Sequence, residues 1–387
     1  MEIKPDPLLQ EFLSEKRTES TKKRTRIHLQ NYCKFTEQQP TELIKEAWKE
    51  SKSELPPWER GLKGKIKGFK EHLEEKNYSE STVKEAVTAV RSFYSHFEIP
   101  LPRMRFQYVE TDTASNVVGK TSDLPGREEI KYALQFAKPR MTAIILTMAS
   151  SGMDASTARS ITVQDFIDGL GDIAKTSENG LLDIEETRVE FERTNGPIVT
   201  WNVRRKKLGL NGKDYFTFST PEAIDAILFY LEQQPPSKPT DTLFRNRNEK
   251  KIGDILFSNY FKRINTLCGF GKRGRFIYFR SHNLRKFFGN MMDPVLGRRD
   301  TEYLMGHQRE KDSISRSYYY PDMQALRIRY REHMGKLTFL EEITQREVTN
   351  ERLLEMENQM KEYEARLSEV QRSTNIVVDY EKTEKPD

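Results

Sequence analysis

The sequence is poor in the residues and patterns that several common chemistries require. Its 387 residues include only two cysteines, Cys33 and Cys268, which excludes a disulfide scaffold and a four-ligand zinc site. The six histidines lack metal-ligand spacing, and residues 269–272 lack the spacing of a phosphate-binding loop. No apolar run approaches the ~18–20 residues of a membrane span. We therefore expect a cytoplasmic protein without a secretory signal, metal, cofactor or membrane partner.

Charge is abundant but unevenly distributed. Charged residues make up 32% of the chain and the net charge is only +5. Residues 341–387 contain 13 Asp/Glu and 7 Lys/Arg, so this tail carries −6 and the remainder +11. Residues 261–286 contain eight Lys/Arg and no acid, and two further basic clusters lie in residues 16–26 and 204–213. Three such clusters favour a polyanionic partner over simple solvated faces.

Apolar periodicity predicts a helical bundle over residues 1–102. One helix begins near Pro7, and another has Ser79 as its N-cap. Two more are marked by the apolar residues within 27–35 and 69–73. Residues 103–122 lack periodicity and are interpreted as a linker.

A second domain is predicted over residues 123–340. An apolar helix spans 144–153 and ends near Gly152, and another helix begins at Pro221. Two β-rich runs, 199–207 and 215–219, are joined by Asn211-Gly212, which is typical of a hairpin. The predicted fold class is therefore mainly α with a small β-hairpin.

The tail differs from both domains. Its apolar residues are spaced 3, 4, 3, 4 and 3, which predicts an amphipathic or coiled-coil helix over residues 341–372; they are Leu353, Met356, Met360, Tyr363, Leu367 and Val370. The alternative is a helix that packs on its own domain. Residues 373–387 are predicted to be disordered.

An ordered set of short motifs indicates chemistry. His282-x-x-Arg285 places two donors on one helix face, because residues three apart are neighbours on a helix. Gly306-His307 follows about 20 residues later, and residues 318–320, three tyrosines before a proline, follow about 10 residues after that. A lysine on the predicted hairpin precedes them all. Each motif alone is weak, and their order is what indicates a shared site.

This order resembles the tyrosine recombinase, or phage integrase, family, and most closely its archaeal integrase branch. The resemblance covers residues ~5 to ~340 and includes the segments 150–153, 161–166, 215–223 and 318–321. It implies a core-binding, DNA-binding domain over 1–102 and a catalytic domain over 123–340. It also implies strand cutting through a 3′-phosphotyrosyl link without metal or ATP. The implied partner is double-stranded DNA rather than a small molecule, bound by a homotetramer because strand exchange requires four nucleophiles.

The resemblance also implies residue roles. A phosphodiester under attack gains charge on its non-bridging oxygens, and an arginine offers a bidentate fork for that charge. Arg285 would supply the fork and His282 and His307 further donors. Lys207, with Lys206 as a nearby alternative, would protonate the leaving 5′-oxygen.

The nucleophile would be one of the three adjacent tyrosines. The branch pattern Ala/Ser-Tyr-Tyr/Phe-x-Pro maps its first tyrosine onto Tyr318. Tyr319 is the alternative nucleophile, and Tyr320 is the third candidate.

The chain departs from the family pattern Gly-[Leu/Met]-Arg-x-x-Glu-Leu. Asp154 stands in place of the arginine and Thr157 in place of the acid. Arg159, five residues further on and ~140° around a helix, is the candidate substitute. This departure from the family pattern favours an alternative function, that of a catalytically weakened or inactive integrase-derived DNA-binding protein. A third hypothesis is an assembly protein built on the C-terminal helix.

Overall fold

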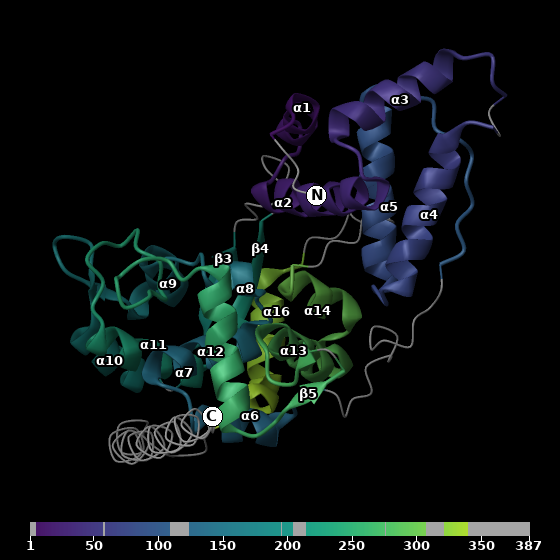
Figure 1. The fold of residues 1–387 in the computed structure, drawn as a ribbon. Helices are drawn as coiled ribbons and strands as arrows, with labels where there is room; N and C mark the ends of the chain where they lie inside the picture. The colour runs from purple at the N-terminus through teal and green to yellow at the C-terminus, as the bar shows by residue number, and fades with distance from the viewer. Residues whose placement is uncertain are drawn as a thin grey trace, which may run out of the picture. The chain divides into compact units, whose positions relative to one another are not determined.

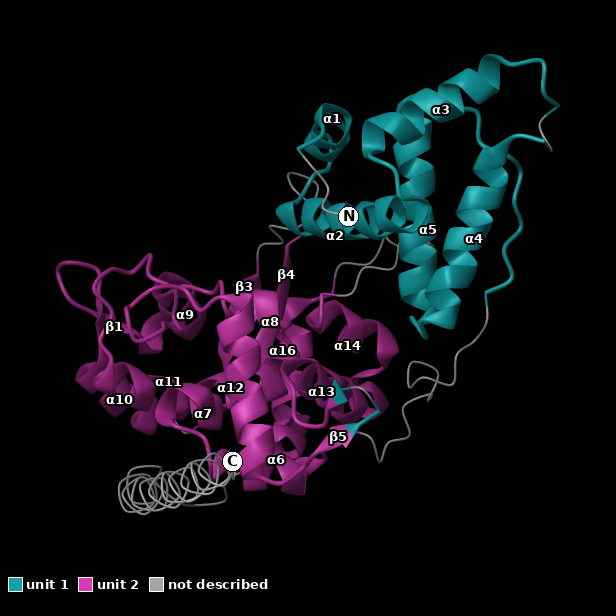
Figure 2. Ribbon diagram, viewed as in Figure 1, with its two compact units in different colours: residues 1–121, 273–276 teal, residues 122–272, 277–387 magenta. Residues whose placement is uncertain are grey.

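The computed structural model describes residues 5–56, 59–108, 124–194, 196–203, 214–274, 276–306 and 321–339. The chain divides into two compact units, residues 1–121 with 273–276, and residues 122–272 with 277–387 (Figure 2). Each unit has its own hydrophobic core. In the described ranges the strands occur only as short antiparallel pairs among many helices. The predicted fold class, mainly α with a small β-hairpin, is therefore confirmed.

The first unit contains five described helices (Figure 1): α1 (Pro7–Ser14), α2 (Glu19–Thr36), α3 (Pro40–Lys52), α4 (Gly61–Glu75) and α5 (Glu80–His96). The predicted start near Pro7 and the predicted N-cap at Ser79 are confirmed, and Ser79 Oγ accepts a hydrogen bond from the Thr82 N–H. Helix α3 was not among the predicted helices. Most of that helix is polar, and its only buried apolar side chains after the initial proline are Leu43, Ile44 and Ala47.

Aromatic side chains fill the core of this unit. The rings of Phe12 and Phe93 meet edge to face at 5.4 Å, and those of Tyr32 and Phe69 at 5.0 Å. The hydroxyl groups of Tyr32 and Tyr94 lie 3.2 Å apart in the interior. Because each hydroxyl is the other's hydrogen-bond partner, two phenols are buried without an isolated polar atom.

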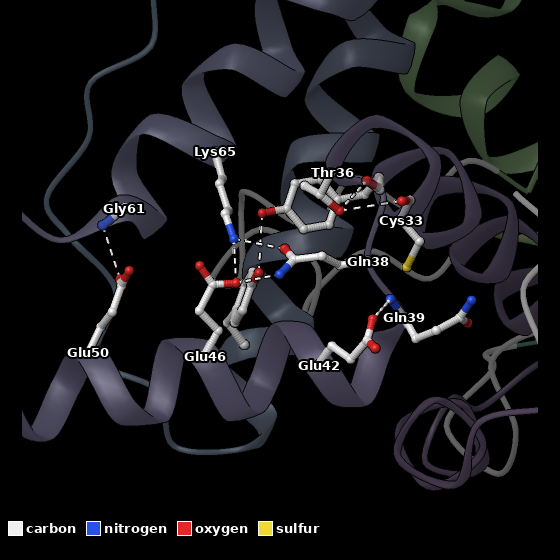
Figure 3. A network of polar contacts seen from close by, with 11 residues as sticks. Cys33, Thr36, Gln38, Gln39, Glu42, Glu46, Glu50, Gly61 and Lys65 are labelled. Atoms are coloured by element: carbon white, nitrogen blue, oxygen red, sulfur yellow. Dashed lines mark hydrogen bonds and ion pairs between the residues drawn. The ribbon is translucent and has the colours of Figure 1, made fainter.

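A polar network joins α3, α4 and the turn after α2 (Figure 3). Lys65 Nζ donates to Gln38 Oε1 at 2.8 Å and to Glu46 Oε2 at 2.6 Å. Burial acts to raise the pKa of Glu46, but the hydrogen bonds from Lys65 and Gln38 outweigh it and the pKa is lowered. A second carboxylate of α3, Glu50, accepts the Gly61 N–H at the start of α4.

The second unit is built around α7 (Pro139–Ser151), which is buried on nearly all sides. A helix that is apolar all round belongs in a core. The other described helices are α6 (Arg127–Leu134), α8 (Ala155–Ala158), α9 (Val163–Leu170), η2 (Gly171–Ile173), α10 (Ile184–Arg193), α11 (Pro221–Gln233), α12 (Asp254–Leu267), α13 (Ser281–Leu296), α14 (Arg298–Leu304), α16 (Met323–His333) and η4 (Met334–Leu337). The predicted helix end near Gly152 and the predicted start at Pro221 are confirmed.

Three two-stranded sheets are present in the described ranges. They pair β1 (Lys175–Thr176) with β2 (Leu182–Asp183), β3 (Val199–Val203) with β4 (Tyr215–Ser219), and β5 (Lys272–Arg273) with β6 (Phe276–Ile277). In the β3–β4 pair, Val199 lies opposite Ser219 and Val203 opposite Tyr215. All of β4 is buried, and Trp201 Nε1 donates to Ser219 Oγ at 2.9 Å. The predicted strand run 215–219 is confirmed.

Several predictions fall on positions outside the described residues. These are the part of the β-rich run after Val203, the Asn211-Gly212 turn, most of the predicted linker and the tail beyond Phe339. The helical, coiled-coil and disordered assignments for the tail therefore stay predictions.

Candidate active site

The C-terminal end of α7 is where the motif segments meet. A helix leaves its last carbonyl groups without partners within the helix. Here three consecutive carbonyls accept hydrogen bonds from other elements. The Tyr330 hydroxyl donates to Ser150 O at 2.8 Å, and Thr217 Oγ1 donates to Ser151 O at 2.7 Å. Arg285 Nη1 donates to Gly152 O at 2.7 Å. Elements α16, β4 and α13 are thereby attached to one helix end.

Arg285 connects two segments that are distant in sequence. Besides its bond to Gly152 O, it donates from Nη2 to Met305 O at 2.5 Å. Its side chain lies in α13, and the residue is only 6% exposed. A guanidinium carries five N–H donors in one plane, and these bonds fix the orientation of that plane. The arginine of the His-x-x-Arg motif is therefore held against both the turn after α7 and the turn that precedes His307.

Two glycines allow this close packing. Gly152 and Gly306 both have φ near +65°, in the left-handed region that favours glycine. A Cβ at Gly152 would lie 2.5 Å from the Phe288 ring, and one at Gly306 would lie 2.6 Å from the Tyr215 ring. The turn before His307 thus packs on the first residue of β4. Because Tyr215 pairs with Val203, the two chain ends that lead into residues 204–213 lie beside that turn.

His282 lies in the first turn of α13 and is exposed. Side-chain hydrogen bonds fix the start of this helix, since Arg280 Nε donates to Asn283 Oδ1 and Asn283 Nδ2 donates to Tyr278 O. Burial lowers the pKa of Arg280. His282 is exposed whereas Arg285 is buried, and the expectation that both side chains face one phosphate stays a prediction.

Asp154 caps a helix. Its Oδ1 accepts the N–H groups of Ser156 at 2.8 Å and Thr157 at 2.9 Å, at the start of α8. Aspartate is among the best N-cap residues because its carboxylate satisfies N–H groups that lack partners in the helix. The cap gives a local structural reason for an aspartate where the family pattern has an arginine.

Arg159, the candidate substitute, is 8% exposed and is held by other elements. Its Nε donates to Ala155 O at 3.1 Å and its Nη1 to Ile252 O at 3.0 Å. Its Nη2 forms an ion pair with Asp254, at the start of α12. All three guanidinium nitrogens thus bind α8 or the residues that begin α12. The catalytic role of Arg159 stays a prediction.

The remaining predicted site residues cannot be located from the structure. His307, Lys206, Lys207 and the tyrosines at 318–320 lie outside the described residues. Of the predicted set, the structure therefore places Arg285, His282 and Arg159. It joins Arg285 to the Gly152 and Gly306 turns and attaches Arg159 to Asp254.

Thr217 and Tyr330, which bind the end of α7, were not among the predicted site residues. Burial raises the pKa of Tyr330, so its hydroxyl stays protonated and can donate. A buried threonine in a strand and a tyrosine at helical spacing look like ordinary core residues. No local signal in the sequence identifies the carbonyl groups that they bind.

Metal-binding and membrane-spanning features are absent from the described ranges. The described side chains contain no group of three or more His, Cys, Asp or Glu arranged to hold a metal ion. Each helix within the described ranges is too short or too polar to cross a bilayer.

Comparison with known proteins gives matches among solved structures only. No family model and no curated protein matches this chain. XerA recombinase is 17% identical, over 85% of this chain and 98% of its own, with a TM-score of 0.33. Tn1549 transposon integrase (residues 82–397) in complex with circular intermediate DNA is 15% identical, over 75% of this chain and 91% of its own, with a TM-score of 0.46. A lambda integrase tetramer bound to a Holliday junction is 10% identical, over 82% of this chain and 79% of its own, with a TM-score of 0.48.

Proposed function

We propose that this chain is a site-specific DNA recombinase of the tyrosine recombinase type, in the archaeal integrase-like branch. It cuts and rejoins double-stranded DNA through a 3′-phosphotyrosyl intermediate, without metal or ATP. It acts in the cytoplasm as a homotetramer on paired DNA sites.

One observation carries the proposal. Arg285, from the His-x-x-Arg motif, donates hydrogen bonds to both Gly152 O and Met305 O. These carbonyls belong to the two other segments in which the family pattern has catalytic residues. A chance match of short motifs gives no reason for three such segments to meet at one guanidinium.

The proposed chemistry assigns one role to each residue. The Tyr318 hydroxyl loses its proton and attacks phosphorus in line with the 5′-oxygen, so that the bond to this oxygen breaks. Lys207 protonates the leaving oxygen. Arg285, His282 and His307 stabilise the charge on the non-bridging oxygens. In the second step a 5′-hydroxyl of another strand gives its proton to Lys207 and attacks the phosphotyrosine. The bond between phosphorus and the Tyr318 oxygen then breaks, and the tyrosine regains a proton from solvent. Because the bond energy is retained, ATP is not required.

A second candidate is an integrase-derived DNA-binding protein that has lost turnover. Asp154 favours it, because a carboxylate beside the scissile phosphate would oppose the anion electrostatically. The ion pair of Arg159 with Asp254 favours it too, since this contact would have to open before Arg159 could reach DNA.

A nicked suicide duplex separates the two candidates. After cleavage, the short nicked fragment diffuses away and the covalent adduct accumulates. We expect an adduct in a denaturing gel that is absent in Tyr318→Phe and retained in Tyr319→Phe and Tyr320→Phe. If the adduct is lost only in Tyr319→Phe, the nucleophile is Tyr319 rather than Tyr318. A mobility shift without an adduct in the unsubstituted protein and all three variants would support the binding protein.

The proposed oligomeric state needs its own test. Cross-linking of the protein on a duplex that carries two sites should give species up to the tetramer. Monomers alone on DNA would contradict the tetramer.

A further inference from the structure

The peptide unit between Gly152 and Met153 is held at both of its polar edges. Gly152 O accepts the hydrogen bond from Arg285 Nη1 at 2.7 Å, and the Met153 N–H donates to Ser151 Oγ at 3.2 Å. A trans peptide unit is planar, and its N–H and C=O point in opposite directions. Fixing the direction of the N–H therefore also fixes the direction in which Gly152 O meets the guanidinium.

Ser151 is completely buried and is itself fixed by two further hydrogen bonds. Its Oγ donates to Thr147 O, one turn earlier in α7, at 2.6 Å. A hydroxyl group has one proton and two lone pairs, so the lone pairs remain for the Met153 N–H. The Ser151 carbonyl accepts the hydrogen bond from Thr217 Oγ1 at 2.7 Å. Ser151 thus links β4 to the turn that binds Arg285.

Thr217 is a rigid donor. It lies at the centre of β4, a strand that is buried along its whole length. It is paired with Trp201 of β3, whose ring stacks on Phe166 with the ring centres 5.8 Å apart. Threonine is β-branched, so its χ1 angle is restricted and its hydroxyl oxygen has few alternative positions. The packing of β4 therefore fixes the position from which the Ser151 carbonyl is held.

We propose that Ser151 and Thr217 are positioning residues for Arg285. Thr217 holds Ser151, Ser151 holds the peptide unit after Gly152, and the carbonyl of that unit orients the guanidinium. Both side chains are 0% exposed, so each acts through Arg285 and not by touching DNA. The inference rests on the proposed recombinase function, in which the planar fork of Arg285 must face the non-bridging oxygens of the phosphate.

Single-turnover adduct formation on the nicked suicide duplex, at saturating DNA, tests the proposal. Thr217→Val keeps the shape of the side chain but removes the donor, and Ser151→Ala removes the other hydroxyl. Each should slow adduct formation by about five- to tenfold, the equivalent of one hydrogen bond. The affinity for duplex DNA in a mobility-shift titration should not change, because the cation is misoriented and not removed.

Two matched variants control for the substitutions. Thr217→Ser keeps the hydroxyl and should retain the normal rate of adduct formation. Thr200→Val makes the same change as Thr217→Val at a half-buried position of the paired strand and should also leave the rate normal. A normal rate in folded Thr217→Val and Ser151→Ala proteins would overturn the proposal.

Combined variants separate positioning from a general structural loss. Arg285→Ala alone should lower the rate by about 10²–10³-fold. Adding Thr217→Val to it should lower the rate by less than about twofold more, because the group that Thr217 positions is already gone. A purely structural role would multiply the two losses. An undiminished second loss would therefore overturn the proposal.

A second cycle of variants needs no DNA cleavage. The urea midpoint of unfolding should shift less in the Thr217→Val, Arg285→Ala double variant than the two single shifts added together, because both changes free the same turn. Additive shifts would mean that Thr217 does not hold Arg285, and would overturn the proposal even for an active enzyme. If the unsubstituted chain forms no adduct, the recombinase function fails, and this cycle still decides whether Thr217 holds Arg285.

Discussion

The region around Arg285 and the region around Arg159 differ in how each holds a buried arginine. Arg285 donates to two main-chain carbonyls, Gly152 O and Met305 O. Arg159 donates to carbonyls as well but also pairs with the Asp254 carboxylate. The two carbonyls orient the guanidinium of Arg285, and the carboxylate of Asp254 offsets the charge of Arg159. The comparison teaches that burial alone does not mark an arginine as an anion-binding residue, because its acceptors decide what charge it presents.

The largest effect is expected from Arg285→Ala. Removing a donor aimed at developing charge lowers rates by about 10²–10³-fold, and we expect a loss of this size in adduct formation on the suicide duplex. Leaving Gly152 O and Met305 O without partners should also cost about 1–3 kcal/mol in the free energy of unfolding. Arg285→Lys is the control, because it keeps the charge but loses the planar fork. Adduct formation within tenfold of normal in a folded Arg285→Ala protein would contradict the proposed role.

Gly306→Ala tests the packing beside Arg285. The new Cβ would lie 2.6 Å from the Tyr215 ring at a residue with φ near +65°. We expect a loss of about 1–3 kcal/mol in unfolding free energy, measured by chemical denaturation. Gly269→Ala is the matched control, since Gly269 has a φ of +66° and nothing lies within 4 Å of its added Cβ. Equal stability of the two variants would mean that the turn before His307 is not held against β4.

The third prediction concerns the ion pair of Arg159. Asp254→Asn removes the charge that offsets Arg159, while Arg159→Gln removes the cation. If Arg159 substitutes for the missing arginine, adduct formation should fall in Arg159→Gln and stay level or rise in Asp254→Asn. The side chain of Asp254 is 86% exposed, so the pair itself should contribute only about 0.2–1 kcal/mol to stability. Unchanged adduct formation in Arg159→Gln would limit this arginine to holding α8 and α12 together.

The smallest effect is expected at Asp154. Asparagine is as good an N-cap as aspartate, so Asp154→Asn should change stability by less than about 0.5 kcal/mol. Asp154→Ala loses the cap and should cost about 1 kcal/mol. If the carboxylate opposes the DNA phosphate, both variants should form adduct faster, and DNA titrations should show tighter binding. Slower adduct formation in Asp154→Asn would argue instead that the carboxylate takes part in the site.

Local features of the fold were predictable. Ser79 caps α5, Pro221 begins α11 and Gly152 ends α7, as their residue types indicate. Helix α3 was missed because it buries few apolar side chains. The short β1–β2 and β5–β6 pairs were also missed, since two-residue strands leave no period-two pattern to detect.

The candidate site was predictable only as a set of motifs. Spacing alone places His282 and Arg285 on one face of a helix. It does not show that Asp154 caps α8 or that Arg159 pairs with Asp254, because these contacts depend on where each helix begins and on what packs beside it.

The amino-acid sequence by itself determined where α1, α5 and α11 begin and where α7 ends, because caps, prolines and apolar periodicity act within a few residues. It also determined the uneven charge and the order of the motifs. Only the tertiary structure decided the acceptors of Arg285, which lie 133 and 20 residues away along the chain. Contacts of that range arise from the packing of α13 against the end of α7 and the turn after α14, and no local pattern encodes this packing.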